Sequence, residues 1–401
     1  MSTRSKQEYF AVLRERYRSS ASKTERTKVI DEAIANTGLH RKSVIRALNA
    51  EVLTPEIPRL GRPRLYSGEC FELLKRFYRA TEYLCADKLK AMLPVLMAEA
   101  DWEMSEELKK KLGEMSPASM DRYLGPYRKI ERRRRNSSTR PGSRLFKKLV
   151  PLKSLTLVSP RCGYLEADTV AHCGGSMAGD FIFSLTITDT FSGWTENRAV
   201  FGKSAKAVLP AIESIHRSLP FEIVSVNVDN GSEFLNHRTY EYFKILGELR
   251  TIPFPMTRSR SYQKNDNCHV EQKNWTHVRQ LFGYDRFEFR ELTVIMDEIY
   301  AVQNQMQNFF IPQFKLQSKV RVGAQIKKQY DKPTTPYERI LNDTKTSDAA
   351  KKRLRETYAT LRYFELQRHK EELLTYFIET HRRLRSENQA LPQGSLLTAA
   401  R

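Results

Sequence analysis

The chain has 401 residues, with 68 lysines and arginines against 47 aspartates and glutamates, a formal net charge of +21 at pH 7. A chain this long exceeds one ordinary hydrophobic core and predicts two to four domains. No apolar run approaches the roughly 18 residues of a membrane span, and the N-terminus lacks the apolar stretch of an export signal. Five cysteines without paired spacing argue against a disulfide framework and for reduced thiols in a cytosol.

The positive charge is concentrated at the two ends of the chain. Residues 1–150 carry 33 Lys and Arg against 19 Asp and Glu, residues 151–290 carry 16 against 15, and residues 291–401 carry 19 against 13. Basic arms around a near-neutral middle favour binding of a polyanion, by default nucleic acid. A generally basic, solubilising surface is the alternative that charge alone leaves open.

Residues 1–52 are predicted to form a helix-turn-helix unit. Apolar spacing predicts helices over Lys6–Tyr17, Lys23–Ala35 and His40–Ala50, with a glycine-containing turn before the third. Apolar residues share one face of the third helix, and basic residues that include Lys42 and Arg46 lie elsewhere on it, as in a helix that reads DNA. A plain three-helix bundle is the alternative.

A linker over residues 53–66, rich in Gly and Pro, separates this unit from a second one over residues 67–127. Helices are predicted over Cys70–Thr81, Ala86–Glu99 and Ser105–Leu112, and a further helix begins with Ser116 as N-cap and proline at its first position. The last helix directs Arg122 outward. The pattern resembles a second helix-turn-helix, and a helical spacer is the alternative.

The segment 128–159 is predicted to be a flexible basic linker. Residues 128–148 hold ten Lys and Arg and one Glu, with Ser, Pro and Gly and no apolar period. Such a segment condenses onto phosphates. Arg132 and Arg133 are therefore expected to bind DNA, and a merely solvated tether is the alternative.

The middle domain, residues 160–290, has strong strand signals. Three consecutive antiparallel strands are predicted over Cys162–Val170, Phe181–Asp189 and Trp194–Phe201. The elements expected after them are a helix over Ser204–Ser218, a strand over Ile223–Val228, a helix over His237–Leu246, a short strand over Leu249–Ile252, a loop over Pro253–Lys264 and a helix over Asp266–Phe282.

Three acidic residues occupy three different settings in this domain. Asp168 lies at the end of the first strand, Asp229 follows the fourth strand, and Glu271 lies early in the last helix. A strand–helix–strand fold could bring the three carboxylates to one point. Two charges ~4 Å apart repel by about 4 kcal/mol at an effective dielectric of ~20, so such a cluster needs cations or protons. A hard divalent metal with oxygen ligands is the natural occupant.

The order β-β-β-α-β-α-β-α is that of the ribonuclease-H-like folds. Residues 163–290 resemble the catalytic domain of bacterial insertion-sequence transposases of the retroviral-integrase superfamily, over the stretches EADTVAHCGG, LTITDTFSGWTENRAV, VDNGSEF and RSYQKNDNCHVEQKNW. These motifs occur in the family's order and cover about a third of the chain. The 41 residues between Asp229 and Glu271 exceed the family's commonest gap, which puts the geometry of the intervening loop in doubt.

The resemblance implies an α/β ribonuclease-H-like core with a mixed five-stranded sheet and helices. All-α helix-turn-helix units would precede it, and a basic, mostly helical arm over residues 291–401 would follow. It also implies that Asp168, Asp229 and Glu271 are both the catalytic residues and the ligands of two Mg²⁺ ions, which Mn²⁺ could replace. Two such ions can align a nucleophile and stabilise the leaving oxygen of a phosphodiester.

Several neighbours of these acids were assigned other roles. Glu233 and Asp266 are interpreted as acids at helix starts. Trp194 and Trp275 are expected in the core. Adjacent Cys and His pairs lack the spacing of a zinc site. DNA contacts near the scissile bond are expected for five residues: Arg258, Arg260, Lys264, Asn267 and Lys273.

In the C-terminal arm the sequence predicts a helix over Leu292–Phe310, a basic strand pair over 314–328 that could touch DNA, and a short helix within 334–340. A single long helix is predicted over Asp348–Leu384, interpreted as an ordinary solvated helix or as a partner-binding or bracing one. The last dozen residues have the composition of a disordered tail.

The sequence thus predicts a DNA transposase, or integrase-type recombinase, that binds transposon ends and carries out metal-dependent 3′-end cleavage and strand transfer. Its expected partners are transposon-end DNA, target DNA and further copies of itself, with no membrane and no small-molecule cofactor. A bacterial cytoplasmic, nucleoid-associated location is expected. The alternatives are a transposase-derived DNA-binding regulator without catalysis and a ribonuclease-H-like nuclease that cleaves without joining.

Overall fold

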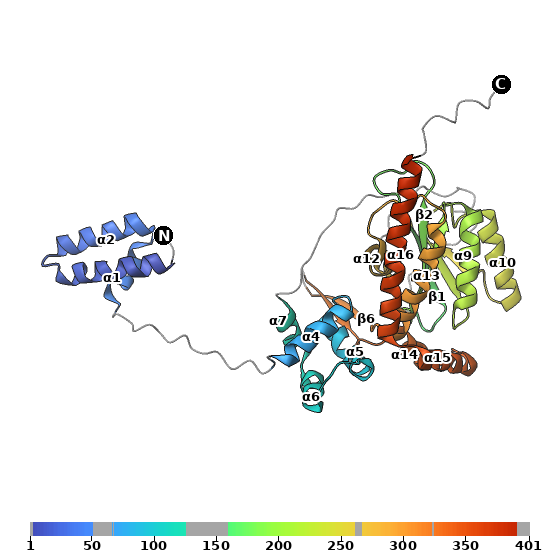
Figure 1. Ribbon diagram of the computed structural model, residues 1–401, viewed down its shortest axis with the longest axis horizontal. Coiled ribbons are helices and arrows are strands. Elements are labelled where there is room, and N and C mark those ends of the chain that lie inside the picture. The colour runs from blue at the N-terminus through green and yellow to red at the C-terminus, as the bar shows by residue number, and fades with distance from the viewer. Residues whose placement is uncertain are drawn as a thin grey trace, which may run out of the picture. The chain divides into compact units, whose positions relative to one another are not determined.

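The computed structural model describes residues 3–50, 66, 68–125, 159–260, 267–322 and 325–390. The chain divides into two compact units, Met1–Leu65 and Tyr66–Arg401 (Figure 1). No helix among these described ranges is long and apolar enough to cross a membrane. The predicted linkers at 53–66 and 128–159 lie almost entirely outside the described residues, so their character stays a prediction.

The first unit contains the three predicted helices, α1 (Thr3–Ser19), α2 (Lys23–Thr37) and α3 (Arg41–Asn49). Gly38 ends α2 in the left-handed conformation, with φ of 68°. The helices are held together by one apolar cluster: Phe10, Leu13, Val29, Ile30, Ala33, Val44 and Leu48. The helices are confirmed, and their use as a DNA reader stays a prediction.

The second unit begins with four helices, α4 (Glu69–Ala80), α5 (Ala86–Glu99), α6 (Glu106–Glu114) and α7 (Pro117–Leu124). The predicted cap of α7 is confirmed, because the Ser116 hydroxyl accepts a hydrogen bond from the Ser119 backbone N–H at 3.2 Å. These helices share one apolar cluster with residues far along the chain, among them Trp194, Phe309, Phe310 and Tyr363. They are therefore packed onto the rest of this unit.

The predicted five-stranded mixed sheet is confirmed. Its strands are β1 (Tyr164–Ala171), β2 (Ile182–Asp189), β3 (Thr195–Phe201), β4 (Ser225–Val228) and β5 (Met256–Arg258), in the order β3-β2-β1-β4-β5. β1, β2 and β3 pair antiparallel, whereas β4 runs parallel to both β1 and β5. Asp168 therefore lies within β1, with three strand residues after it, and not at its end as the sequence predicted.

Helices cover both faces of the sheet (Figure 1). Along β1 successive side chains alternate between the faces. Leu165 and Ala167 join an apolar cluster with α9 (Ala205–Ser218) and α10 (His237–Arg250). Val170 points the other way, into a cluster with helices that include α13 (Leu292–Gln305). Glu166 and Asp168 share the second face with Val170, so both carboxylates face the side where the later helices lie.

The short strand predicted over 249–252 was wrong. α10 continues to Arg250 and ends at Thr251, which adopts the left-handed conformation with φ of 52°. The edge strand β5 lies further on, inside the predicted loop. The backbone hydrogen bonds of α10 continue past Leu246, although the side chain of Leu249 is 79% exposed and is not packed against the core.

The helix predicted to carry Glu271 is confirmed. It begins at Cys268 and runs through α11 (Cys268–Lys273), the π-helical stretch η2 (Asn274–Arg279) and α12 (Gln280–Phe282). Asp266 lies outside the described residues, so its predicted capping role is untested. Trp194 is buried as predicted, but Trp275 is 43% exposed, which corrects the prediction of a core residue.

The C-terminal arm holds α13, η3 (Met306–Phe310), β6 (Leu316–Val322), β7 (Gln325–Tyr330), α14 (Pro336–Asn342), α15 (Asp348–Thr360) and α16 (Tyr363–Ala390). β6 and β7 form an antiparallel pair, as predicted, and their contact with DNA stays a prediction. The single helix predicted over 348–384 is two helices. The Glu99 carboxylate accepts a hydrogen bond from the Tyr363 backbone N–H at 2.6 Å, so a residue distant in sequence caps the second helix.

α16 is a bracing helix and not a solvated one. Phe377 is 3% exposed within the cluster that covers the sheet. Lys370 is buried, and its ammonium lies 2.5 Å from Glu82 Oε1 and 3.2 Å from Gln303 Oε1. This ion pair and the Glu99 cap join the α4–α7 helices to the C-terminal arm.

The substitution Glu82→Gln should lower the free energy of unfolding by about 1–2 kcal/mol, because it leaves the buried Lys370 ammonium without its counter-ion. The Glu82 side chain is half exposed, so solvent screening reduces the effect. Denaturant unfolding measures the change, and Glu379→Gln, at an exposed position of α16, is the matched control. Equal stability of the two variants would contradict the bracing role.

Candidate active site

The register between β1 and β4 brings two of the three predicted acids together. The strands run parallel, with Ala167 opposite Val228. Asp168 and Asp229 are the next residues on the two strands and therefore stand at neighbouring positions, with the strands about 4.8 Å apart. The Asp229 carboxylate accepts a hydrogen bond from the Gly231 backbone N–H at 2.8 Å, so the turn after β4 fixes its direction.

Glu166 positions the helix that carries Glu271. Its buried carboxylate accepts hydrogen bonds from the backbone N–H groups of His269, at 2.9 Å, and Val270, at 3.2 Å. A carboxylate at the start of a helix satisfies N–H groups that have no partner within the helix. Glu166 lies two residues before Asp168 and therefore on the same face of β1, but its role at the start of this helix was not predicted from the sequence.

A side-chain contact strengthens this connection. Glu166 Oε1 lies 3.1 Å from His269 Nδ1. Burial lowers the pKa of His269, but hydrogen bonds with Cys268 and Glu166 outweigh it and raise that pKa to about 9. The imidazole is therefore protonated at neutral pH, and its charge balances that of the buried carboxylate.

Asp168 lies at the centre of the site. The Asn274 amide donates to Asp168 Oδ2 at 2.8 Å, and the Thr169 backbone N–H donates to Oδ1 at 2.8 Å. Burial, together with the negative charges of Asp229, Glu233 and Glu271, raises the pKa of Asp168 to about 8 against the lowering effect of the Thr169 hydrogen bond. Asp229 and Glu271, the other two predicted acids, therefore both act electrostatically on Asp168.

Glu233 is a fourth carboxylate of this acid cluster, which comprises Asp168, Asp229, Glu233 and Glu271. It was predicted to be an acid at the start of a helix, but α10 begins at His237 with Asn236 as its cap. Glu233 is 1% exposed, 2.8 Å from the Lys203 ammonium, and accepts a hydrogen bond from the Thr169 hydroxyl at 3.0 Å.

Gly231 makes room for this buried carboxylate. A Cβ atom at that position would collide with both carboxylate oxygens of Glu233. The glycine of the VDNGSEF motif is therefore required for packing, and the Glu–Lys203 pair was not visible in the sequence because Lys203 lies 30 residues earlier.

The carboxylate oxygens of the acid cluster suit a hard cation, although the described residues form no complete metal site. Carboxylate oxygens are the ligands that Mg²⁺ prefers. Glu233 Oε2 is buried and lacks a hydrogen-bond partner in the described part of the chain. However, no group of three or more His, Cys, Asp or Glu side chains in that part is arranged to hold a metal ion. In this arrangement Asn274 occupies one oxygen of Asp168, where a cation would otherwise bind.

The predicted DNA-contacting residues lie in several places. Lys42 and Arg46 are exposed on α3, and Arg122 is exposed on α7. Arg258, on β5, and Arg260 are partly buried near the acid cluster, where Arg258 donates to Asn230 Oδ1 at 3.4 Å. Three of the predicted residues fall outside the described residues: Arg132, Arg133 and Lys264.

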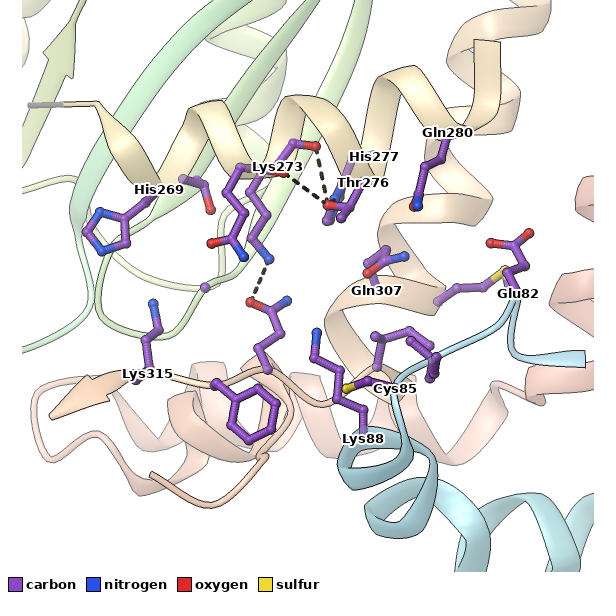
Figure 2. Close-up of a pocket in the computed structure, with 18 of the residues that line it drawn as sticks. Glu82, Cys85, Lys88, His269, Lys273, Thr276, His277, Gln280, Gln307 and Lys315 are labelled. Carbon is purple, nitrogen blue, oxygen red and sulfur yellow. Dashed lines mark hydrogen bonds between the residues drawn. The ribbon is translucent and has the colours of Figure 1, made fainter. Parts of the chain in front are cut away.

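Two further predicted DNA contacts lie on or beside α11 and differ in exposure. Asn267 is 7% exposed, and its side-chain oxygen accepts a hydrogen bond from the Asn227 amide, so this side chain helps to hold the helix start against β4. Lys273 points to the other side of the helix, into a pocket where its ammonium donates to Gln313 Oε1 at 2.5 Å (Figure 2).

Comparisons with known proteins find similarities both in sequence and in structure. The chain is 36% identical over 332 residues to the uncharacterized protein y4rM of Sinorhizobium fredii, an alignment that covers 81% of this chain and 92% of that protein. The catalytic core domain of BIV integrase matches with a TM-score of 0.28 and 14% identity, covering 45% of this chain and 94% of that one. A TM-score of that size does not by itself assign a fold or a function. No protein-family model matches the chain.

The substitution Lys203→Met should lower the free energy of unfolding by about 2–3 kcal/mol, because it leaves the buried Glu233 charge unpaired. The double variant Lys203→Met/Glu233→Gln should recover most of that loss, since it removes both charges. Denaturant unfolding of the two single variants and the double variant measures the coupling. Additive effects would show that the ion pair does not bear on stability.

Stability without divalent cations should fall as pH rises from about 4 to 8. The folded-state pKa of Asp168 is raised from 3.8 to about 8, so over this window the folded state holds a proton that the unfolded state has released. Asp168→Asn should remove this dependence and unfold at a higher temperature than the wild type at pH 8. Thermal unfolding in EDTA tests this, with the exposed Asp101→Asn as control. A wild-type slope retained in Asp168→Asn would refute the assignment.

Proposed function

The chain belongs to the family of the uncharacterized protein y4rM of Sinorhizobium fredii, and we propose that it is a polynucleotidyl transferase that cuts and joins DNA. Its substrate class is the phosphodiester backbone of specific DNA ends, in the manner of insertion-sequence transposases and integrases. The proposal is supported by the neighbouring positions of Asp168 and Asp229 at two paired strands and by the electrostatic effect of Asp229 and Glu271 on Asp168.

The order of elements supports the same proposal. The order β1-β2-β3-α9-β4-α10-β5-α11, with β4 and β5 parallel to β1, is the ribonuclease-H-like order expected from the sequence. In that order one acid lies on the first strand, one follows the fourth strand and one lies on a later helix. The residues at those places are the three acids.

Asp168, Asp229 and Glu271 would hold the divalent ions, Mg²⁺ or Mn²⁺. When bound, such ions activate an oxygen nucleophile and neutralise charge at the phosphorus. The protein supplies the binding groups and their orientation. Asp168 offers both carboxylate oxygens once the Asn274 amide turns away, and the Gly231 N–H orients the Asp229 carboxylate.

Three other residues position this constellation without touching the substrate. Glu166 holds the N-terminus of α11 and thereby sets the position of Glu271. Lys203 compensates the negative charge of the buried Glu233 within the acid cluster. The Thr169 hydroxyl donates a hydrogen bond to Glu233, and Thr169 directly follows Asp168 in the chain. Thr169 therefore connects the buried Lys203–Glu233 pair to the proposed metal ligands.

The basic arms would provide the DNA binding. The exposed Lys42, Arg46 and Arg122 would contact the sugar–phosphate backbone or base edges of the transposon ends, and the basic segment over 128–148 would add phosphate contacts. Joining two ends to one target requires more than one active site, so we propose a homo-oligomer as the working form.

One observation favours a second candidate. Asn274 occupies an oxygen of Asp168, and the described residues present no complete metal site. A regulator derived from a transposase, which binds the same DNA ends without cutting them, would retain such an arrangement permanently. The two functions differ in whether a divalent ion produces chemistry.

A strand-transfer assay with labelled end DNA, target DNA and Mg²⁺ tests the proposal. The wild type should yield joined product, and Asp168→Asn, Asp229→Asn and Glu271→Gln should each reduce it at least about 10³-fold while still binding the end DNA. Glu248→Gln, at an exposed position of α10, is the matched control and should retain activity. Binding without any product in the wild type would favour the regulator, and cleavage without joining would favour a nuclease.

A further inference from the structure

A pocket of about 550 Å³ lies beside the helix that carries Glu271. One wall is the side of that helix with His269, Lys273 and His277 (Figure 2). The start of α5, with Lys88, and the segment before β6, with Lys315, form the other walls. Residues from the α4–α7 helices, the five-stranded sheet and the C-terminal arm therefore meet in one cavity.

Three lysines point into this lysine pocket from different elements: Lys88, Lys273 and Lys315. Figure 2 shows Lys273 descending from its helix, with Lys88 and Lys315 directed toward it from the opposite side. Lys88, Lys273 and Lys315 all line this one pocket, so their ammonium groups repel one another. Like charges at this range repel and favour loss of a proton or gain of an anion.

The carboxylates in and near the pocket have other partners. Asp189 accepts hydrogen bonds from Ser192 and from the Gly163 backbone N–H. Glu166 is engaged by the start of α11, and Glu82 pairs with Lys370. The negative charges of Asp189, Glu166 and Asp331 partly offset that of Lys315, so the surplus positive charge of the pocket lies mainly on Lys88 and Lys273.

Burial makes the surplus positive charge of the pocket lysines still less favourable. It lowers the pKa of Lys315 to about 8 and also lowers that of Lys88. Lys315 has one hydrogen-bond acceptor, the Thr190 carbonyl oxygen at 2.8 Å. An anion that entered the pocket would favour the charged form of both ammonium groups.

Two buried polar atoms in the pocket wall also lack partners. Gln313 is 7% exposed; its carbonyl oxygen accepts from Lys273, but its Nε2 has no hydrogen-bond partner in the described ranges. His277 is 1% exposed, and its Nε2 is likewise without a partner there. Buried polar groups of this kind are usually satisfied by protein, water or a ligand.

Gly193 leaves space for the side chain of Gln313 in the pocket wall. It lies in the turn between β2 and β3 with φ of 81°, and a Cβ atom at this position would collide with Gln313 Oε1. The same hypothetical atom would lie 3.6 Å from Lys315 Nζ. The turn therefore brings the backbone close to Gln313 and Lys315 and supports both side chains.

The helix itself relates the pocket to the acid cluster. Residues two apart on a helix point in nearly opposite directions, so Lys273 faces the pocket while Glu271 faces away from it. Asn274, which contacts Asp168, extends the acidic side of the helix. The same helix thus presents the Glu271 carboxylate on one side and the Lys273 ammonium group on the other.

We propose that the lysine pocket binds a phosphate group of a DNA strand whose neighbouring segment reaches the acid cluster. The proposal rests on the proposed DNA function, because that function supplies the strand. Phosphate suits the site because Lys88, Lys273 and Lys315 offer separate ammonium groups that can surround a tetrahedral anion, and the unpartnered amide and imidazole N–H groups can add donors.

Equilibrium DNA binding tests the proposal independently of chemistry. Fluorescence anisotropy of a labelled oligonucleotide is measured for the full chain and for Lys88→Gln, Lys273→Gln and Lys315→Gln, across a series of salt concentrations without divalent ions. Each variant should weaken binding on the order of tenfold at low salt and lower the slope of log affinity against log salt by about 1. Lys110→Gln, at an exposed position of α6, is the matched control and should change neither.

Thermal stability gives a second readout. Removing one of three mutually repelling charges should raise the unfolding temperature of the DNA-free protein in each pocket variant, whereas a purely structural lysine would lower it on substitution. Unchanged DNA affinity in all three folded variants would overturn the proposal, and so would a lower unfolding temperature in all three.

Competition with inorganic phosphate separates the two sources of the anion. If DNA supplies the phosphate, millimolar phosphate should compete only weakly with the oligonucleotide. If free phosphate alone raises the unfolding temperature in a Lys273-dependent way while DNA affinity is the same in every variant, the strand assignment is overturned. Because the readout is binding, a chain without strand-transfer activity can still support the pocket, and an active chain can still refute it.

Discussion

The parallel pairing of β1 with β4 is the constraint on which the rest of the site depends. It fixes Asp168 and Asp229 at neighbouring positions in a largely buried place, where their charges repel. The surrounding groups are arranged to tolerate this repulsion. Asn274 donates to one carboxylate, and Lys203 neutralises the deeper Glu233. A proton shared within the cluster, or the divalent ion that we propose to bind there, would complete the balance.

The position of the helix after β5 also depends on β1. Glu166 holds its first N–H groups, so the strand that carries Asp168 also determines where Glu271 and Lys273 lie. The contact between the Glu166 carboxylate and these N–H groups therefore determines how the acid cluster and the lysine pocket are spaced. The π-helical stretch that follows, with Asn274 as its first residue, shifts the helical register immediately after the acidic turn.

The sequence predicted the elements whose signals are local and strong. The alternating apolar residues of β1 to β3 located these strands, whereas the place of Asp168 within β1, the exposed Trp275 and the edge strand β5 were predicted wrongly. Their positions depend on packing: β5 is three residues long and gains its identity from β4. The role of Glu233 depends on Lys203, a partner 30 residues away that no periodic pattern reveals.

The Glu99 cap on Tyr363 and the Glu82–Lys370 pair have a consequence for biosynthesis. These contacts join segments that are separated by more than 260 residues. The α4–α7 helices therefore emerge from the ribosome long before α16, the helix that finishes their packing. Until α16 is made, Tyr78 and its apolar neighbours have an incomplete cover. The α4–α7 helices of a nascent chain therefore cannot complete this packing until α16 has been synthesised.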